Sequence, residues 1–143
     1  MRISTVLGGK GHLVVTVRPN DTVNDLLLIL KEYNIGAAVV SDDGTVALGV
    51  ASERDVVRNL VTQGTGLLDY PVSFIMTPIK VVCSGSSSVE EVMALMTSGR
   101  VRHVPVYTEE QTLEGIVSIG DIVKSYIDHL EYERRSLIAY VTS

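Results

Sequence analysis

The sequence predicts an α/β (α+β) domain in which two β-α-β-β-α repeats pack together about a pseudo-two-fold axis. The chain matches itself at a shift of 66 residues, and Val-rich strand segments alternate with apolar helical segments in both copies. Neither copy alone can cover its apolar helix faces. We therefore divide the chain into repeat 1, residues 1–66, and repeat 2, residues 67–143, which ends in a C-terminal helical extension.

The internal match holds without a gap over most of each repeat. The matched positions are Thr22-Val23 with Ser88-Val89, Ile35 with Val101, Val40 with Val106, Gly49-Val50 with Gly115-Ile116, Ser52 with Ser118, Asp55 with Asp121 and Val57 with Val123. Further upstream the shift is 69, because Val6-Leu7 best matches Ile75-Met76. Repeat 1 thus carries about three extra residues near its start.

Repeat 1 is expected to contain a strand at 12–17, a helix at 22–34, strands at 36–41 and 45–52, and a helix at 52–63. Pro19 ends the first strand, and good N-cap residues precede the first helix. The run Asp42-Asp43-Gly44 predicts a hairpin turn, and Gly64 ends the second helix. The first helix is apolar on nearly all sides, so it should be buried both against its own sheet and against another surface.

Repeat 2 is expected to follow the same order after a connector at 65–74. Its elements are a strand at 80–83, a helix at 88–98, strands at 101–107 and 112–117, and a helix from 118 onward. Apolar residues recur every three or four positions along this last helix, and we expect its end to fold over the neighbouring repeat. The glycine-rich segment 7–11 is expected to be a flexible loop.

Composition excludes several classes of protein. The 143 residues are enough for one sizeable core. The net charge is −5 and no run of five Lys or Arg occurs, which argues against nucleic acid as a partner. The apolar runs are far shorter than the roughly 20 residues of a membrane span, and residues 1–12 lack the pattern of a secretory signal. The single cysteine, Cys83, fits a reducing compartment, so we expect a cytoplasmic protein.

The sequence shows no pattern typical of an enzyme or a metal protein. No glycine-rich phosphate-binding motif occurs, and no nucleophile is paired with a base. His12, His103 and His129 lack metal-ligand spacing. Cys83 has no base or second cysteine near it, so we expect it to be a small buried apolar residue. We expect no catalytic residue, no metal and no required cofactor.

A Ser-x-x-Asp motif occurs twice, as Ser52 with Asp55 and as Ser118 with Asp121, each after a strand and at the start of a helix. The structural interpretation is a helix cap, because serine accepts a hydrogen bond from a free amide and an acid suits the first turn. The functional interpretation is a nucleoside phosphate site. A carboxylate there can accept both ribose hydroxyls while the serine donates to phosphate, and a helix N-terminus favours anions.

The strand before the second motif adds groups suited to such a site. Arg102 and His103 supply donors for phosphate near the same end of the sheet. Pro105 lies inside this strand, and a proline there indicates an edge or an irregular position that leaves room for a ligand. Taken alone, His103 also fits an ordinary hydrogen-bonded or packing histidine.

These residues resemble a known family. The segments IGAAVV…LGVASERDVV and VRHVPV…EGIVSIGDIV, with SFIMTP ahead of the second, are similar to a tandem pair of cystathionine-β-synthase-type (CBS) domains, called a Bateman module. The resemblance covers nearly the whole chain. It implies binding of adenosine-type ligands such as AMP, ADP, ATP, NAD or S-adenosylmethionine in clefts between the repeats, and pairing of modules into dimers.

The resemblance also implies two sites. The first would use Asp121 for ribose, Ser118 for phosphate or ribose, the segment Ile79, Lys80 and Val81 for adenine, and Arg102, His103 and Pro105 as lining, with Arg54 leaning across to phosphate. The second would use Ser52, Asp55, His12, Val15 and Ala37. Repeat 1 has Gly36 and Ala37 where repeat 2 has Arg102 and His103. We therefore expect the first site to bind a mononucleotide and the second to be empty, weaker or selective for another ligand.

The sequence thus predicts a ligand-sensing regulatory module rather than an enzyme. AMP is the expected ligand, with ADP, ATP or NAD as alternatives, and binding would pass a conformational signal to an unidentified downstream protein. A homodimer is expected from the two-sided apolar helices at 22–34 and 88–98. The competing hypothesis is a structural or protein-interaction dimer whose clefts stay empty. Neither nucleic acid nor a membrane is expected as a partner.

Overall fold

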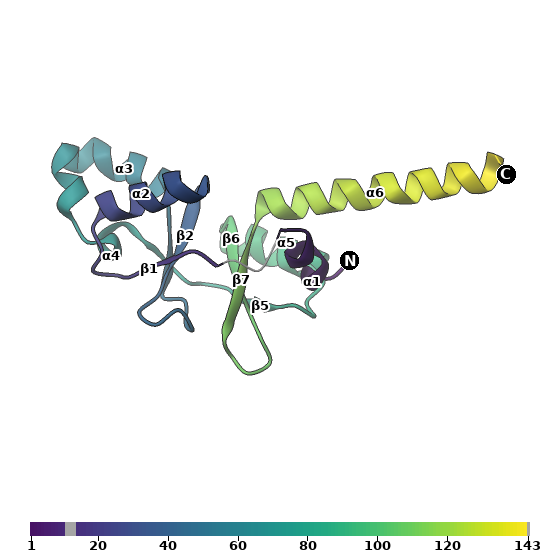
Figure 1. The fold of residues 1–143 in the computed structure, drawn as a ribbon, viewed down its shortest axis with the longest axis horizontal. Coiled ribbons are helices and arrows are strands. Elements are labelled where there is room, and N and C mark those ends of the chain that lie inside the picture. Colours follow the sequence, from purple (N-terminus) through teal and green to yellow (C-terminus); the bar gives the residue numbers. More distant parts are fainter. Residues whose placement is uncertain (11–13, 143) are drawn as a thin grey trace.

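The computed structural model describes residues 1–10 and 14–142. The elements in chain order are α1 (Ile3–Lys10), β1 (Thr16–Val17), α2 (Val23–Tyr33), β2 (Ala37–Val40), β3 (Gly49–Ser52), α3 (Glu53–Gln63), the 3-10 helix η1 (Gly64–Asp69), α4 (Val72–Ile75), β4 (Thr77–Pro78), β5 (Cys83–Ser84), α5 (Val89–Gly99), β6 (His103–Tyr107), β7 (Leu113–Ser118) and α6 (Ile119–Thr142). They form two halves side by side, one holding α2, α3 and α4 and the other α1, α5 and α6 (Figure 1).

Each half contains a small mixed sheet. The first sheet has the order β1-β2-β3-β4 and the second the order β5-β6-β7. In both, a short first strand runs parallel to the next strand, which pairs with its successor in antiparallel fashion. A small apolar cluster joins the halves, with Val39 and Ala47 from one and Leu113 from the other. The predicted fold of two packed repeats is confirmed.

Capping explains where the predicted helices begin and end. Thr22 accepts from the amide of Asp25 at 3.1 Å, and the Asp25 carboxylate accepts from the Thr22 amide at 3.0 Å. This capping box starts α2 inside the predicted range. The helix ends at Asn34, whose φ of 51° is the left-handed conformation of many helix C-caps. Only one face of α2 is buried, since Leu28 on the opposite face is 60% exposed.

Several strands are shorter than expected. β1 covers only Thr16–Val17 of the expected 12–17, of which 12 and 13 lie outside the described residues, and β5 begins only at Cys83. Residues 45–48 are irregular because the Asp43 carboxylate accepts from the amides of Thr45, at 2.9 Å, and Val46, at 3.4 Å. These bonds, with that of Thr45 as the largest cause, also hold the pKa of Asp43 below its ordinary value.

Segments at the edges of the repeats exchange between the two halves. Ile3, Val6 and Leu7 of α1 lie in the core of the second half, although they belong to repeat 1 in the sequence. Leu67 and Val72, which follow repeat 1 in the chain, complete the core of the first half together with Ile75. The division at residues 66 and 67 therefore describes the sequence repeat, whereas each packed half takes a helical segment from beyond that division.

Two equivalent glycines make room for these exchanged segments. A Cβ on Gly49 of β3 would lie 2.8 Å from the carbonyl oxygen of Thr77, in β4. A Cβ on Gly115 of β7 would lie 2.8 Å from Cδ2 of Leu7, in α1. Gly49 and Gly115 are related by the 66-residue shift. Their repetition therefore reflects close packing of a neighbouring segment on each sheet.

The expectation of a flexible loop at 7–11 is wrong for residues 7–10, because α1 continues through them. The apolar side chains at positions 3, 6 and 7 share one helix face and are fully buried. The start of the helix is also tied to repeat 2, since the amides of Ile3 and Ser4 donate to the carbonyls of Ser87 and Gly85, both at 2.9 Å. Burial and these hydrogen bonds outweigh the low helix propensity of Gly8 and Gly9.

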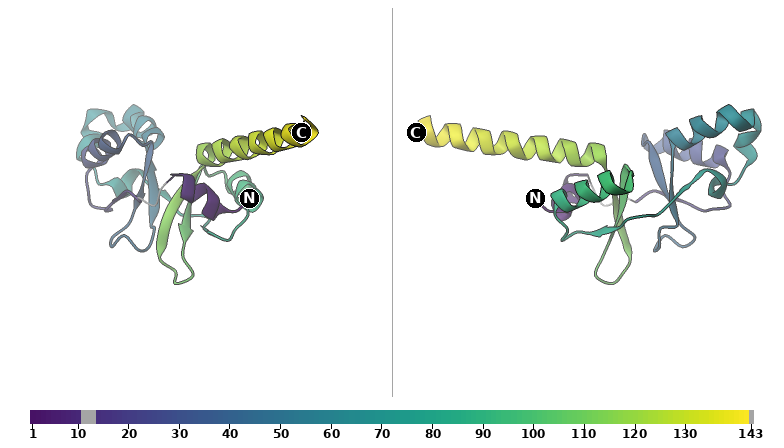
Figure 2. Two further views of the ribbon diagram at one scale, coloured as in Figure 1. Left: turned by 45° about the vertical axis from the view of Figure 1, so that its right-hand side comes forward. Right: turned by 180° about the vertical axis from the view of Figure 1, so that it is seen from behind.

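The expectation that the end of the last helix folds over the neighbouring repeat is also wrong. α6 is a single helix that runs away from the body of the protein (Figures 1 and 2). From residue 121 to residue 142 the sequence has neither glycine nor proline, so nothing breaks the helix. Its only fully buried residue is Ile122.

Candidate functional site

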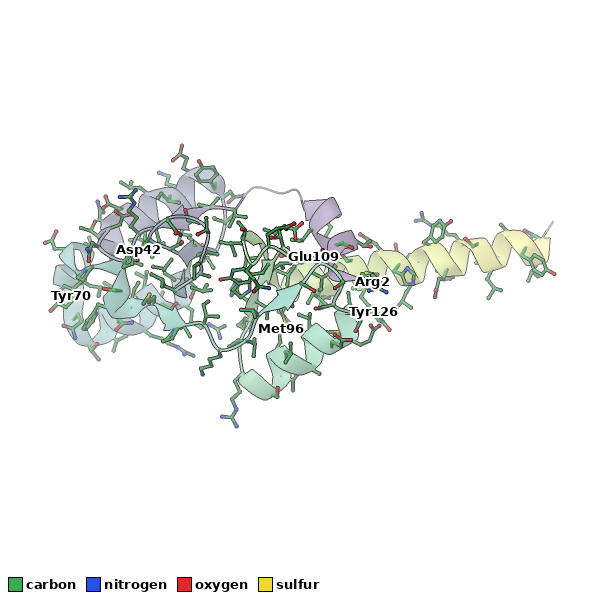
Figure 3. All side chains as sticks on the ribbon, turned by 90° about the horizontal axis from the view of Figure 1, so that it is seen from below. Arg2, Asp42, Tyr70, Met96, Glu109 and Tyr126 are labelled. Carbon is green, nitrogen blue, oxygen red and sulfur yellow. The ribbon has the colours of Figure 1, made fainter. Side chains whose placement is uncertain are left out.

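A cleft of about 770 Å³ lies between the two halves. That volume is within the range of small-molecule sites. Most of its lining comes from four segments: the start of α3, residues 77–81, the C-terminal end of α5 and residues 100–103. Met96 of α5, at the boundary between the two halves, is one of its apolar lining residues (Figure 3). Both repeats therefore contribute to one site.

The N-terminus of α3 brings a structured carboxylate to the cleft. Ser52 caps the helix, because its hydroxyl accepts from the amide of Asp55 at 3.2 Å. One carboxylate oxygen of Asp55, Oδ2, accepts from the amide and hydroxyl of Ser52, both at 2.9 Å. The other, Oδ1, accepts from the hydroxyl of Thr77 at 3.3 Å. The carboxylate is thus oriented by both repeats and keeps acceptor capacity for a ligand.

The N-terminus of α6 repeats this cap. The amide of Ser118 donates to the Asp121 carboxylate at 2.9 Å, and the amide of Asp121 donates to the Ser118 hydroxyl at 3.0 Å. The capping interpretation of the Ser-x-x-Asp motif is therefore confirmed in both copies. Neither Ser118 nor Asp121 lines the cleft, although Ile119 between them does.

The structure groups the predicted residues differently from the sequence. Ser52 and Asp55, expected in the second site, line one cleft together with residues expected in the first, namely Arg54, Ile79, Lys80, Val81, Arg102 and His103. The reason is the exchanged strand β4. It pairs with β3, with Val50 opposite Thr77, so the following residues 79–81 pass beside the start of α3.

The other predicted site residues lie elsewhere. Pro105 is buried on the middle strand β6. It lies one residue before the first β5–β6 pair at Val106, so that pairing needs no amide from it. Ala37 lies on β2 opposite Ser52, and Val15 packs against the core of the first half. His12 lies outside the described residues. None of the described residues in this group lines the cleft.

Five polar lining residues were not predicted from the sequence: Glu53, Arg58, Thr77, Thr97 and Arg100. Arg58 lies one helical turn beyond Arg54, so the two share a face of α3. Their spacing in the sequence could therefore have predicted that Arg58 lines the same site as Arg54. Thr77 belongs to the segment SFIMTP, but its bond to Asp55 depends on the exchange of β4. Arg100 caps the end of α5 in the left-handed conformation, with a φ of 52°, and no local pattern places its side chain at a cleft.

The cleft has a cationic lining in an acidic protein. Five positive side chains line it against two acidic ones: Arg54, Arg58, Lys80, Arg100 and Arg102 against Glu53 and Asp55. Within residues 1–10 and 14–142, none of the five makes a side-chain hydrogen bond or an ion pair. The walls also include apolar side chains, among them Val50, Ile79 and Val81. This arrangement suits a ligand with a flat apolar part and a strongly anionic part.

Cys83 behaves as the sequence predicted. It is buried, and its thiol lies 3.7 Å from the carbonyl oxygen of Pro105. Burial raises its pKa from 9.0 to about 11, so the reactive thiolate is scarce at neutral pH. In the part of the chain that the structure describes, no cluster of three or more His, Cys, Asp or Glu side chains could hold a metal ion. No helix among these residues is long and apolar enough to cross a membrane.

Known proteins share this architecture. The family model for the CBS domain matches residues 13–62 and again residues 72–128. The mitochondrial CBS domain-containing protein CBSX3 of Arabidopsis thaliana is 33% identical over 147 residues, covering 97% of this chain and 71% of the relative. The crystal structure of a CBS-domain protein from Agrobacterium tumefaciens is 41% identical, with a TM-score of 0.81 over 88% of this chain and 99% of that chain.

A further solved structure contains a ligand. A CBS domain protein from Pyrobaculum aerophilum, in complex with AMP, is 25% identical, with a TM-score of 0.73 over 85% of this chain and 89% of that chain. The internal repeat, the two mixed sheets, the cleft between them and the matches in sequence and structure agree. The chain belongs to the CBS domain family, as a tandem pair of these domains.

Proposed function

We propose that this chain is a regulatory module that binds an adenine nucleotide in the cleft between its repeats. The observation that carries the proposal is the position of the Asp55 carboxylate, at a helix N-terminus, in a cleft that Lys80, Arg100 and Arg102 line from the other repeat. A carboxylate suits the two hydroxyls of a ribose and the cations suit phosphate. The AMP complex of the Pyrobaculum protein supports the same class of ligand.

Each part of the cleft has a role in this proposal. Asp55 accepts hydrogen bonds from the ribose hydroxyls, and Ser52 and Thr77 hold its carboxylate in place. Ile79 and Val81 form an apolar wall for the adenine ring. AMP is the ligand expected from the sequence, with ADP, ATP and NAD as alternatives.

A second cleft would be the counterpart of the first under the 66-residue shift. It would combine Ser118 and Asp121 with Val15 and Ala37. Of these residues none carries a positive charge. We propose that this cleft binds a phosphate-bearing ligand more weakly than the first, or stays empty.

The proposed output is a change in conformation rather than a reaction. The cleft residues come from both repeats, so a ligand contacts both and stabilises the arrangement that fits it best. Only a difference in affinity between two arrangements can produce a signal to a downstream protein.

We further propose that the protein is a cytoplasmic homodimer without catalytic activity. The exposed large apolar residues on α2 and α5 are Leu28, Tyr33 and Met93. Helix α6 exposes many more, so its surface is the better candidate for the dimer contact.

The experiment is a calorimetric titration with AMP, ADP, ATP, NAD, S-adenosylmethionine and, as a control for the base, GMP. We expect at least one adenine nucleotide to bind with a dissociation constant below 1 mM and to bind more tightly than its guanine analogue. Hydrogen exchange with and without that ligand should then show protection at the start of α3 and at residues 77–81. If no adenosine compound binds at millimolar concentration, the proposal fails and the structural dimer with empty clefts becomes the better account.

A further inference from the structure

The positive charge of the cleft exceeds what one phosphate group requires. The five cationic side chains leave three positive charges in excess of Glu53 and Asp55. A single phosphate carries about −1.5 to −2 charges near neutral pH, and each additional phosphate adds negative charge. Among the described residues, the five cationic side chains have no protein partner that would neutralise them. Their charges are therefore available to a ligand.

The positions of the cations suit an extended anionic chain. Arg54 and Arg58 lie one turn apart on α3 of repeat 1. Arg100 and Arg102 follow α5 of repeat 2, and Lys80 lies on the segment that leads from β4 to β5. Positive groups therefore approach the cleft from separate segments of the protein. One phosphate cannot contact them all, while a chain of two or three phosphates can reach several.

The backbone at Arg100 supports the same conclusion. Its φ of 52° is a left-handed conformation, which is costly for a residue other than glycine, asparagine or aspartate. The equivalent position in repeat 1 is Asn34, with a φ of 51°, where asparagine accepts this conformation readily. At this position an asparagine would cap the helix with less strain. Repeat 2 has an arginine instead, and that arginine lines the cleft. Such strain is typical of functional positions.

We propose that the cleft selects adenine nucleotides with two or three phosphates, ADP or ATP, over AMP. This inference rests on the proposed function and names its ligand class. S-adenosylmethionine carries a positive sulfonium in place of phosphate, so the same cations disfavour it. The preference for more phosphates decreases with added salt, because salt screens charges on the rim of a cleft.

The test is a titration of AMP, ADP and ATP at fixed ionic strength with a chelator to remove divalent cations. The dissociation constant of ADP or ATP is expected to be at least about tenfold below that of AMP. Arg58→Gln and Arg100→Asn are each expected to weaken ATP binding by about tenfold and AMP binding by less. The matched control is Lys31→Gln on α2, a cation outside the cleft, which should leave all three affinities unchanged.

The outcomes separate this inference from the proposed function. Equal affinities for AMP and ATP, or equal losses for both in the two cleft variants, would overturn the preference for polyphosphates while leaving nucleotide binding intact. Failure of all three nucleotides to bind would overturn both. Arg100→Asn adds an internal check. It should raise the thermal midpoint, because the strained residue is replaced, and so a loss of ATP binding cannot be attributed to unfolding.

A different observation concerns α6. In Figure 3, Tyr126 lies where this helix leaves the body of the protein. Along one face the helix presents a row of exposed apolar side chains, the α6 stripe: Val123, Ile127, Leu130, Leu137, Ile138 and Val141. Most neighbouring members are three or four residues apart. The longest step is that of seven from Leu130 to Leu137, where Arg134 occupies the intermediate position. This spacing is typical of a helix that pairs with another helix. The 24 residues of α6 span about 36 Å.

The charges on α6 indicate which direction a second helix would run. Arg134 lies in the middle of the α6 stripe, with Glu131 and Glu133 on its flanks. In a parallel pair in register, the two copies of Arg134 would face each other. In an antiparallel pair centred near residue 132, Arg134 lies opposite Leu130 of the second copy and within reach of the second copy's Glu131. Each Arg134 then lies beside an acidic side chain of the second copy rather than beside the second Arg134.

We propose that α6 pairs in antiparallel orientation with α6 of a second copy. The test is the double variant Ile127→Cys and Leu137→Cys, oxidised at low concentration and digested for mass spectrometry. Linkage of residue 127 of one copy to residue 137 of the other is expected, whereas linkage of equal positions would show a parallel pair and overturn the proposal. Wild-type protein is the control, because its only cysteine, Cys83, is buried.

The mass in solution gives a second readout. In sedimentation, Leu137→Glu is expected to convert a dimer into a monomer, while Leu28→Glu on the exposed face of α2 should not. The opposite result, or a wild-type monomer at micromolar concentration, would contradict the proposal. Because Leu137 lies far along α6 from the cleft, nucleotide affinity should be unchanged in that variant, which shows that the fold is intact.

Discussion

The N-termini of α3 and α6 have the same cap and different surroundings. In both, a serine and an aspartate exchange hydrogen bonds between side chain and backbone at 2.9 to 3.2 Å. The residues opposite differ at each equivalent position: repeat 2 has Lys80, Arg100, Arg102 and His103 where repeat 1 has Val14, Asn34, Gly36 and Ala37. The cap therefore accounts for folding in both repeats, and the neighbouring residues determine what each helix N-terminus can bind.

The exchange of β4 decides which neighbours each cap receives. Because β4 pairs with β3, the cleft that the cations of repeat 2 line also includes the cap residues Ser52 and Asp55 of repeat 1, but neither Ser118 nor Asp121. A tandem repeat joined this way can keep one structural motif in both halves while the ligand preferences of the two clefts diverge.

The largest expected effect contrasts the two aspartates. Asp55→Asn should weaken nucleotide binding about a hundredfold, since it removes the charged acceptor for ribose, whereas Asp121→Asn should leave binding in the described cleft unchanged. Both variants should lose similar thermal stability because both weaken a capping box. Calorimetry and thermal unfolding measure the two effects. If Asp121→Asn abolishes binding and Asp55→Asn does not, the assignment of the cleft is wrong.

The two equivalent glycines give the next contrast. Gly49→Ala should lower the free energy of unfolding by about 1–3 kcal/mol, because the added methyl group meets the backbone oxygen of Thr77. Gly115→Ala should cost less, since the nearest atom is the end of the Leu7 side chain, which can move. Urea denaturation measures both. A larger loss in Gly115→Ala would contradict the account of the exchanged segments.

The two cap serines should behave alike in stability and differently in binding. Ser52→Ala and Ser118→Ala should each cost about 1 kcal/mol, the usual effect of losing an N-cap. Only Ser52→Ala should also weaken nucleotide binding, because the Ser52 hydroxyl orients the Asp55 carboxylate. Thermal denaturation with and without nucleotide checks this, and an equal loss of binding in both variants would argue against a single dominant cleft.

The smallest effect concerns Cys83, whose counterpart in repeat 1 is Val17. The raised pKa of the buried thiol means that the unfolded chain loses this proton at lower pH than the folded chain does. The contribution is present below pH 9 and is lost as the pH rises toward about 11. Compared with Cys83→Val, the wild type should therefore lose stability over this range. Parallel pH dependences in the two proteins would contradict the burial of the thiol.

The sequence predicted the repeats, most helices and the two caps, because these depend on local patterns and on the 66-residue shift. Its division into sites placed Asp121 with Arg102 and placed Asp55 in the other site. Nothing local to residues 75–78 shows that β4 joins the sheet of the first half. Helix α1 was also not predicted, because Gly8 and Gly9 favour a loop. Only the burial of its apolar face against the second half makes that segment helical.

We propose above all that the cleft joining Asp55 to the cations of repeat 2 holds an adenine nucleotide. A crystal structure of the full chain grown with ATP tests it most directly. We expect the ribose hydroxyls on the Asp55 carboxylate, the adenine against Ile79 and Val81, and the phosphates among Arg58, Arg100 and Arg102. A nucleotide bound at Asp121 instead, with the described cleft empty, would contradict it.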